Sequence, residues 1–250
     1  MPVIHVNGAS LFYHEYGVGE PVFLLHNFLA TGETCWRKQI PAWRSHYRLI
    51  VPDLRGHGRS ENPGYMPLTH TQFAADIIGL ANALGLESAH FWGVSSGAML
   101  LLTLALRAAP LVRSLVLTAA TYRFGPVNQA RALSLTPATI PASWAAHWQA
   151  IHTPVYGPDY WQTLLAAFHA LNLDGGEVNF PPPAQLAAIT QPTLLIHGDR
   201  DEYFPVETAV ELYRLLPHAA LCIIPQAGHL PNSEHAATWN AAVRAFYETH

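Results

Sequence analysis

The sequence predicts an α/β protein with a mostly parallel, doubly wound sheet and an inserted helical cap. Three observations support this fold class. Short apolar segments alternate with longer segments of helical periodicity, one central region lacks strand-like segments, and a hydrophobic content of 50% of the 250 residues indicates a folded chain. Because strands covered by helices on both faces are apolar on both faces, the alternation indicates parallel strands joined by crossover helices. The length suits one large domain with a sizeable core.

The N-terminal segments predict a β-hairpin at the edge of the sheet. Residues 3–7 and 11–16 are strand-like and are separated only by Gly8 to Ser10, which favours an antiparallel pair. The parallel strands are expected at residues 22–26, 48–51, 89–94, 115–119, 193–197 and 221–224. Helix-length segments separate these strands.

Helical periodicity identifies three of the helices. Apolar residues at positions 73, 77, 80 and 84 share one face, and Gly85 follows them as a C-terminal cap. Residues 97–107 are apolar on all sides and predict the most buried helix. Residues 239–246 predict another amphipathic helix, with Ser233 as its N-cap.

The segment from residue 122 to residue 190 interrupts the alternation. It has no strand-like segment, and prolines at positions 126, 137, 141, 154, 158, 181, 182 and 183 divide it into short helices. We therefore predict a helical cap over residues 122–190, inserted into a core of residues 1–121 and 191–250. Aromatic residues one helical turn apart give these helices aromatic faces. The candidate substrate contacts among them are Trp144, Trp148 and Trp161.

Charge and composition exclude several classes of function. Thirteen basic and 17 acidic residues give a formal charge of −4, which argues against a nucleic-acid partner. The apolar segments are shorter than the about 20 residues of a membrane span, so no membrane association is expected. The first residues lack the pattern of a secretory signal, so the expected location is cytoplasmic. The 15 histidines lack the spacing of a metal site, and we expect no metal and no other cofactor.

The pentapeptide GVSSG at residues 93–97 is the strongest indication of chemistry. It lies between an expected strand and the apolar helix, where a tight turn needs glycines two positions before and after the serine. Ser95 has both glycines, whereas the neighbouring Ser96 does not. The helix N-terminus places backbone amides and partial positive charge beside Ser95, so its hydroxyl can become a nucleophile.

Candidates for a base and for an orienting carboxylate follow two later strands. A nucleophilic hydroxyl near neutral pH needs both groups. Asp199 and Asp201 follow residues 193–197, and His229 follows residues 221–224. The order serine, aspartate, histidine is the one that a nucleophile turn on a doubly wound sheet requires. The spacing alone leaves open which aspartate orients His229.

Together these motifs resemble the α/β-hydrolase superfamily, in its capped esterase and lactonase group. The motifs are LLHNF at 24–28, DLRGHGRS at 53–60, the serine turn, and HGDRD at 197–201 with Gly228 and His229. They span nearly the whole chain and imply the α/β-hydrolase fold. The resemblance implies that Ser95 is the nucleophile, that His229 is the general base and acid, and that Asp201 holds His229.

The resemblance also implies an oxyanion hole formed by the backbone amides of Phe28 and Ser96. Each such donor is typically worth about 3 kcal/mol. The family usually has glycine where this chain has Asn27. Asparagine tolerates left-handed backbone angles, which would preserve the turn, and its side chain could enter the site. Asn27 and Leu230 complete the candidate substrate contacts.

The resemblance predicts a serine hydrolase that cleaves small, largely apolar carboxylic esters or lactones through an acyl-enzyme on Ser95. The only cations of the cap, Arg123 and Arg131, lie near its start, so an uncharged substrate is expected. The alternatives are carbon–carbon bond hydrolysis, lyase, amidase or perhydrolase chemistry with the same triad, and a ligand-sensing receptor. The expected partner is the substrate, and a homodimer is left open. Because Ser95 stands at the nucleophile position, the aspartate chemistry of haloalkane dehalogenases and epoxide hydrolases is excluded.

Overall fold

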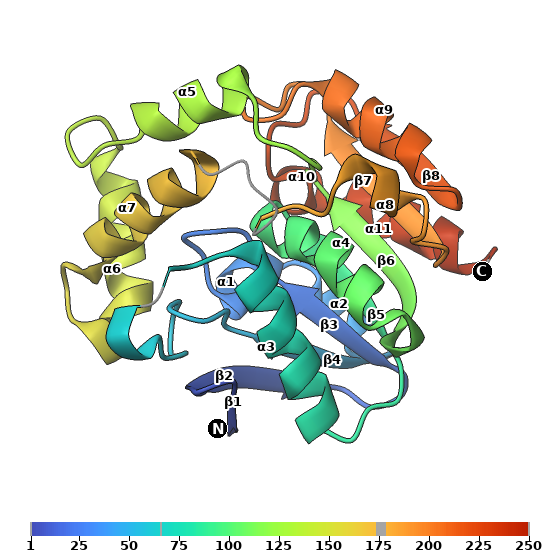
Figure 1. The fold of residues 1–250 in the computed structure, drawn as a ribbon, viewed down its shortest axis with the longest axis horizontal. Coiled ribbons are helices and arrows are strands. Elements are labelled where there is room, and N and C mark those ends of the chain that lie inside the picture. Colours follow the sequence, from blue (N-terminus) through green and yellow to red (C-terminus); the bar gives the residue numbers. More distant parts are fainter. Residues whose placement is uncertain (1, 66, 174–178, 250) are drawn as a thin grey trace.

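The computed structural model describes residues 2–65, 67–173 and 179–249, and the strands of these residues form one eight-stranded sheet (Figure 1). The strands are β1 (Val3–Val6), β2 (Ala9–Tyr16), β3 (Pro21–Leu25), β4 (Arg48–Pro52), β5 (Ala89–Val94), β6 (Val112–Thr118), β7 (Thr193–Gly198) and β8 (Ala219–Ile224). Their order is β1-β2-β4-β3-β5-β6-β7-β8. The pairs β1–β2 and β2–β4 are antiparallel and the other pairs are parallel, which confirms the predicted fold class.

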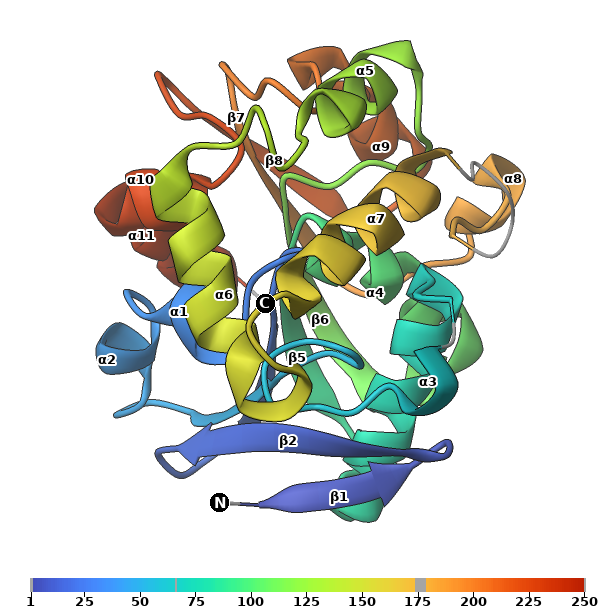
Figure 2. The ribbon, with the colours of Figure 1, turned by 90° about the vertical axis from the view of Figure 1, so that its left-hand side faces the viewer.

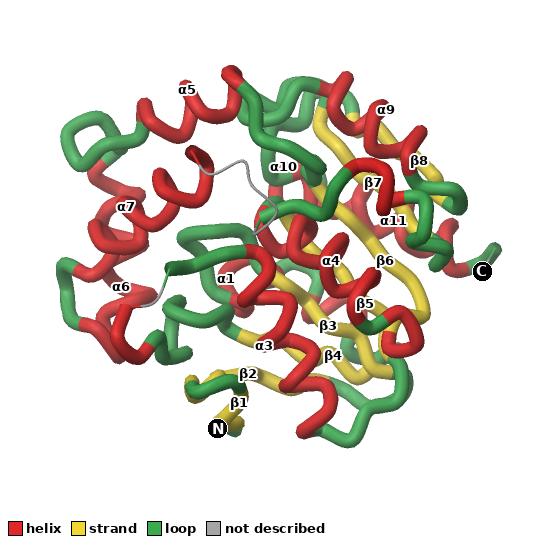
Figure 3. The backbone as a smooth tube through the Cα atoms, viewed as in Figure 1, coloured by secondary structure: helices red, strands yellow, loops and turns green. Residues whose placement is uncertain are grey.

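Helices cover both faces of the sheet (Figure 3). The helices are α1 (Gly32–Trp36), α2 (Ile40–Trp43), η1 (Pro63–Tyr65), α3 (His70–Ala83), α4 (Ser96–Arg107), η2 (Ala109–Leu111), α5 (Pro126–Ser134), α6 (Ala142–Tyr156), α7 (Tyr160–Leu173), α8 (Pro183–Leu186), α9 (Val206–Leu215), α10 (Pro231–Glu234) and α11 (Ala236–Tyr247). Apolar residues of α3 and α4 pack on one face of the sheet, and those of α1, α2 and α11 pack on the other. Across the described ranges, no helix has both the length and the apolarity that crossing a membrane requires.

Consecutive residues of β5 illustrate why these strands are apolar throughout. Phe91 and Trp92 point to opposite faces, and both are fully buried. Phe91 stacks on Phe23, with ring centroids 5.0 Å apart. Trp92 contacts Trp43 and Trp239 on the other face, at 5.0 and 5.4 Å. Each face of the central strands is therefore a separate apolar layer.

The helices of the core begin and end largely where local residues predict. The Thr69 side chain caps α3, and Gly85 follows this helix with a left-handed φ of 67°. The prediction that Ser233 caps the C-terminal helix is wrong. Pro231 starts the separate short helix α10, since proline fits the first turn of a helix, and Ser233 lies inside it. His235 occupies the N-cap of α11 instead.

All elements between β6 and β7 in the described ranges are helices, and α6 and α7 pack side by side (Figure 2). We call α5, α6 and α7 the inserted helices. The prediction of short helices is wrong for α6 and α7, which have 15 and 14 residues. Pro154 lies inside α6, two residues before its end at Tyr156, and Gly157 follows as the C-cap with a φ of 86°. Pro126 and Pro183 start helices, as proline at a first turn does.

Candidate active site

Ser95 lies at the turn between β5 and α4 in a backbone conformation that few residues adopt. Its φ is 53° and its ψ is −119°. A Cβ atom on Gly93 would lie 2.2 Å from the Gly97 carbonyl oxygen, and one on Gly97 would lie 2.3 Å from the Leu25 carbonyl oxygen. The Ser95 carbonyl accepts from the Ala98 amide at 2.8 Å. Close packing of backbone therefore fixes the serine above the N-terminus of α4.

The side chains of Ser95, His229 and Asp201 form a chain of hydrogen bonds. His229 Nε2 lies 3.0 Å from Ser95 Oγ, and His229 Nδ1 lies 2.8 Å from Asp201 Oδ2 and 3.0 Å from Oδ1. Because the carboxylate accepts at Nδ1, that nitrogen carries the proton of the neutral ring and Nε2 accepts from the serine hydroxyl. The three loops that carry these residues follow β5, β8 and β7, whose carboxyl ends meet at one edge of the sheet.

Asp201 is the carboxylate that the structure places behind the histidine. Its side chain is fully buried, and its Oδ1 accepts two backbone amides at 2.8 and 3.1 Å. Burial alone would raise the pKa of Asp201, but the charge and hydrogen bond of His229, together with His197, lower this pKa below its ordinary value. Asp201 is therefore ionised near neutral pH. The alternative carboxylate, Asp199, is exposed.

The loop after β3 carries Phe28, one of the two expected oxyanion donors. Within the described ranges, neither the Phe28 amide nor the Ser96 amide donates a hydrogen bond to another group of the protein. The left-handed angles in this turn occur at Leu29, with a φ of 66°, and not at Asn27. The reason is a β-turn in which the Ala30 amide donates to the Asn27 carbonyl, so that the third residue, Leu29, takes the positive φ.

A cavity of about 480 Å³ opens beside Ser95 and His229. Its apolar lining comes from the loop after β3, from the inserted helices and the residue that follows α5, from the loop after β7 and from the residue after the histidine. These residues are Phe28, Leu29, Ala30, Leu135, Trp144, Trp148, Phe168, Tyr203 and Leu230. Asn27 lines it as well. The structure does not bring Trp161 to this cavity. Trp161 is buried, with its ring centroid 6.2 Å from that of Trp148, because its side of α7 faces the other helices.

Charged groups also border the cavity. They come from outside residues 122–190, the segment whose few cations led to the expectation of an uncharged substrate. Arg200 comes from the loop after β7, where it stands inside the HGDRD motif that contains Asp201. Glu202 is bound by Arg131 at 2.6 Å. Glu234 accepts from the two amides on either side of His229, at 2.6 and 3.0 Å. The cavity is therefore apolar in its centre, with Arg200 as a cation at its border.

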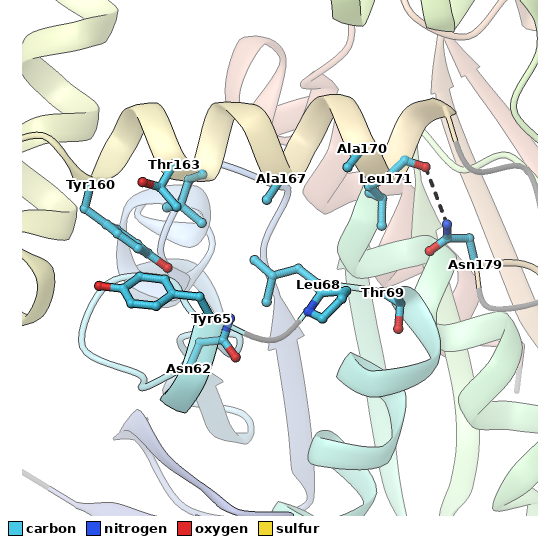
Figure 4. A pocket seen from close by; sticks show the side chains of 12 residues that line it. Asn62, Tyr65, Leu68, Thr69, Tyr160, Thr163, Ala167, Ala170, Leu171 and Asn179 are labelled. Carbon is cyan, nitrogen blue, oxygen red and sulfur yellow. Dashed lines mark hydrogen bonds between the residues drawn. The ribbon is translucent and has the colours of Figure 1, made fainter.

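A second, smaller cavity of about 160 Å³ lies away from these residues (Figure 4). Its lining includes Tyr160 and Leu171 of α7, Tyr65 of η1 and Leu68 before α3. Ser95, Asp201 and His229 are not part of it, so the larger cavity is the candidate active site. Among the described residues, no group of three or more histidine, cysteine, aspartate or glutamate side chains is placed to hold a metal ion.

Comparisons with known proteins find hydrolases along the whole chain. A sequence model described as the alpha/beta hydrolase family matches residues 3–242. The 2-hydroxymuconate semialdehyde hydrolase of Pseudomonas sp. (strain CF600) is 26% identical over 261 residues, covering 96% of this chain and 90% of that protein. The 3-oxoadipate enol-lactonase 2 of Acinetobacter baylyi is 28% identical over 270 residues, covering 98% of each. The structure of a meta-cleavage product hydrolase from Pseudomonas fluorescens IP01 has the same fold, with a TM-score of 0.84 and 24% identity over 100% of this chain and 98% of that chain.

Proposed function

This chain belongs to the alpha/beta hydrolase family, and we propose that it is a serine hydrolase that cleaves small, largely apolar carboxylic esters or lactones. The observation that carries the proposal is the hydrogen-bonded chain from Ser95 through His229 to Asp201, beside a largely apolar cavity. Similarity to an enol-lactonase over 98% of both chains supports the same class of substrate. Residues 122–190 act as the cap of the substrate cavity in this proposal, and the site needs no cofactor.

The first half of the reaction forms an acyl-enzyme. Ser95 Oγ attacks the carbonyl carbon of the substrate while His229 Nε2 takes the hydroxyl proton. The buried carboxylate of Asp201 stabilises the resulting imidazolium. The amides of Phe28 and Ser96 donate to the oxyanion of the tetrahedral intermediate. His229 then gives its proton to the leaving alcohol oxygen, and the carbon–oxygen bond breaks.

The second half of the reaction hydrolyses the acyl-enzyme. His229, again neutral, takes a proton from a water molecule that attacks the acyl carbon. The same two amides stabilise the second oxyanion, and the proton returns to Ser95 Oγ as the acid departs. The residues thus perform the same proton transfers twice, and the protein ends each cycle in its starting state.

Carbon–carbon bond hydrolysis is the second candidate. Arg200 at the border of the cavity suits a substrate that carries a carboxylate as well as the reacting carbonyl. The relative named 2-hydroxymuconate semialdehyde hydrolase, 26% identical over 96% of this chain, also favours this candidate. Both candidates use Ser95, so the substrate rather than the triad distinguishes them.

A substrate panel tests the proposal. The purified protein is assayed with p-nitrophenyl esters of increasing acyl length, with aliphatic and enol lactones, and with 2-hydroxymuconate semialdehyde. A fluorophosphonate probe is used in parallel to label the nucleophile. We expect turnover of a short ester or a lactone, and we expect Ser95→Ala to lower kcat by about 10⁴ to 10⁶ with the fold intact.

Three results would contradict the proposal. A Ser95→Ala variant that retains more than a tenth of the activity places the nucleophile elsewhere. Turnover of the semialdehyde without turnover of any ester or lactone assigns carbon–carbon hydrolysis instead. Labelling of Ser95 without turnover of any panel compound favours the remaining chemistries of this triad or a ligand receptor.

A further inference from the structure

The peptide that contains the Phe28 amide is held by a buried histidine on one side. The Leu54 amide donates to His26 Nε2 at 2.9 Å, so the ring proton is on Nδ1, which donates to the Asn27 carbonyl at 2.8 Å. The Asn27 carbonyl and the Phe28 amide belong to one planar trans peptide and point in opposite directions. Fixing the carbonyl therefore fixes the direction of the amide.

A second buried histidine holds the other side of this turn, and it comes from the inserted helices. The Gly58 amide donates to His152 Nδ1 at 2.9 Å, so the proton lies on Nε2, which donates to the Leu29 carbonyl at 3.2 Å. His152 lies on α6 and is fully buried. It joins α6 to two loops of the core with a single ring.

Both rings are neutral under ordinary conditions, which keeps this pattern of donors and acceptors intact. Burial lowers the pKa of His26 to about 3 and that of His152 to about 4. A protonated His152 would present an N–H group to the Gly58 amide, and that hydrogen bond would be lost. The neutral ring instead accepts on one side and donates on the other.

The position of Leu29 explains why such a contact is needed. A bulky residue with a φ of 66° is strained, and its conformation persists only where the surroundings hold it. The carbonyl group of this strained residue, Leu29, accepts the hydrogen bond from His152. Without this hydrogen bond, the turn of residues 27–30 has one fewer contact that fixes its orientation, and with it the direction of the Phe28 amide.

We propose that His152 is a positioning residue for the oxyanion hole, holding the turn of residues 27–30 through the Leu29 carbonyl. The inference rests on the proposed function, because the Phe28 amide is the donor that it positions. Helix α6 also presents Trp144 and Trp148 to the substrate cavity. His152 therefore connects the helix that contacts the substrate to the loop that stabilises the oxyanion.

Two substitutions separate the two hydrogen bonds of His152. In His152→Asn the side-chain oxygen takes the place of Nδ1 and accepts from Gly58, but nothing reaches Leu29. In His152→Gln the side-chain nitrogen takes the place of Nε2 and donates to Leu29, while the acceptor for Gly58 is lost. Tyr156→Phe is the matched control, since the Tyr156 hydroxyl also joins α6 to the core, at 2.9 Å from the Ser60 carbonyl, but does not contact residues 27–30.

The readouts are kcat and KM for the best substrate of the panel and the rate of phosphonylation of Ser95 by the fluorophosphonate, with thermal unfolding as the test of folding. We expect His152→Asn to lower kcat and the phosphonylation rate about 10- to 100-fold with KM within threefold, because a donor is misplaced rather than removed. His152→Gln should remain within about fivefold of the original protein. Tyr156→Phe should lower the unfolding temperature and leave both rates within twofold.

Equal losses of rate in the Asn and Gln variants would overturn the inference, as would an unchanged rate in His152→Asn. A loss in Tyr156→Phe as large as that in His152→Asn would also overturn it, because general loosening of α6 would then explain both. Phosphonylation does not require that the natural reaction be ester hydrolysis. If the original protein is labelled but turns over no ester or lactone, the proposed substrate class fails while the ratio of the two variants still decides the role of His152.

Discussion

Two backbone segments of the site, the turn at Ser95 and the turn of residues 27–30, are held in place by different means. The Ser95 turn is fixed by close packing around glycines two positions on either side of the serine. The other turn is fixed by histidine contacts to distant segments: His26 binds a residue 28 positions away, and His152 reaches Leu29 from 123 positions away. A short motif can thus encode the first turn, whereas the second depends on the completed tertiary structure.

The largest effect is expected in the part of the site that the motifs encode. Asp201→Asn should lower kcat about 10⁴-fold, because an amide does not hold His229 in the tautomer that accepts from Ser95. Steady-state kinetics on the best ester or lactone measure the loss. The matched control is Asp199→Asn, which should stay within threefold, since Asp199 is exposed. Comparable losses in both variants would mean that the loop as a whole, rather than the buried carboxylate, supports the histidine.

Gly97→Ala tests whether the Ser95 turn needs the second glycine of its motif. A Cβ there would lie 2.3 Å from the Leu25 carbonyl oxygen, so the backbone must shift. We expect kcat/KM to fall at least about 100-fold, since displacement of a reacting group by about 1 Å is enough for such a loss. Gly125→Ala is the control, because the nearest atom to its new Cβ would be 3.9 Å away. An active Gly97→Ala variant would show that the turn tolerates rearrangement.

Acid should lower the free energy of unfolding through the buried histidines, two of which hold the turn of residues 27–30, before it protonates Asp201. Burial lowers the pKa of His26, His57, His70 and His152, to about 3 for His26 and about 4 for His70 and His152. Each is neutral in the folded protein and titrates near its ordinary value of about 6.5 once unfolded. Below about pH 6.5 the unfolded chain therefore binds more protons, and the free energy of unfolding falls by up to about 1.4 kcal/mol per pH unit for each histidine.

Thermal unfolding between pH 7.5 and 4.5 measures this effect. The unfolding temperature should fall steadily below about pH 6.5, and the fall should be shallower in His152→Asn, which has one histidine fewer. Asp201 does not contribute in this window, because its lowered pKa means that its stabilising charge is lost only at still lower pH. An unfolding temperature that is constant from pH 7.5 to 4.5 would mean that these rings take up protons in the folded protein as readily as in the unfolded chain.

The same contrast explains how much the sequence could predict. Apolar periodicity located every parallel strand, but several predicted ends are displaced by one to three residues. The largest differences are the beginnings of β6 and β8, where small or polar residues such as Ser114 join the strand through backbone pairing. The predicted segments also omit one terminal residue of each of β3, β4 and β7. The motifs selected Ser95, Asp201 and His229, which the fold brings into contact. The strand predictions succeeded because each depends on residues that are neighbours in the chain, and the roles of the three side chains stay predictions.

Features that depend on packing could not be predicted in the same way. His152 stands in no motif, and its two partners are 94 and 123 positions away. Trp148 and Trp161 carry the same aromatic signal in the sequence, but only the fold determines that Trp148 borders the cavity while Trp161 is covered. The turn after β3 has its left-handed residue at Leu29, although residue preference alone favours asparagine for such angles.

The smallest effect is expected at these two tryptophans, where it is read as a change in substrate preference. Trp148→Ala enlarges the cavity, so kcat/KM for long acyl esters relative to acetyl esters should change about 3- to 10-fold, since contacts of this size contribute of the order of 1 kcal/mol. Trp161→Phe, which keeps most of a buried ring, should leave the ratio unchanged. Competition between acetyl and octanoyl esters in one reaction measures the ratio directly. A larger change in Trp161→Phe than in Trp148→Ala would place the acyl group behind the surface that Trp148 forms, and the border assigned to the cavity would be wrong.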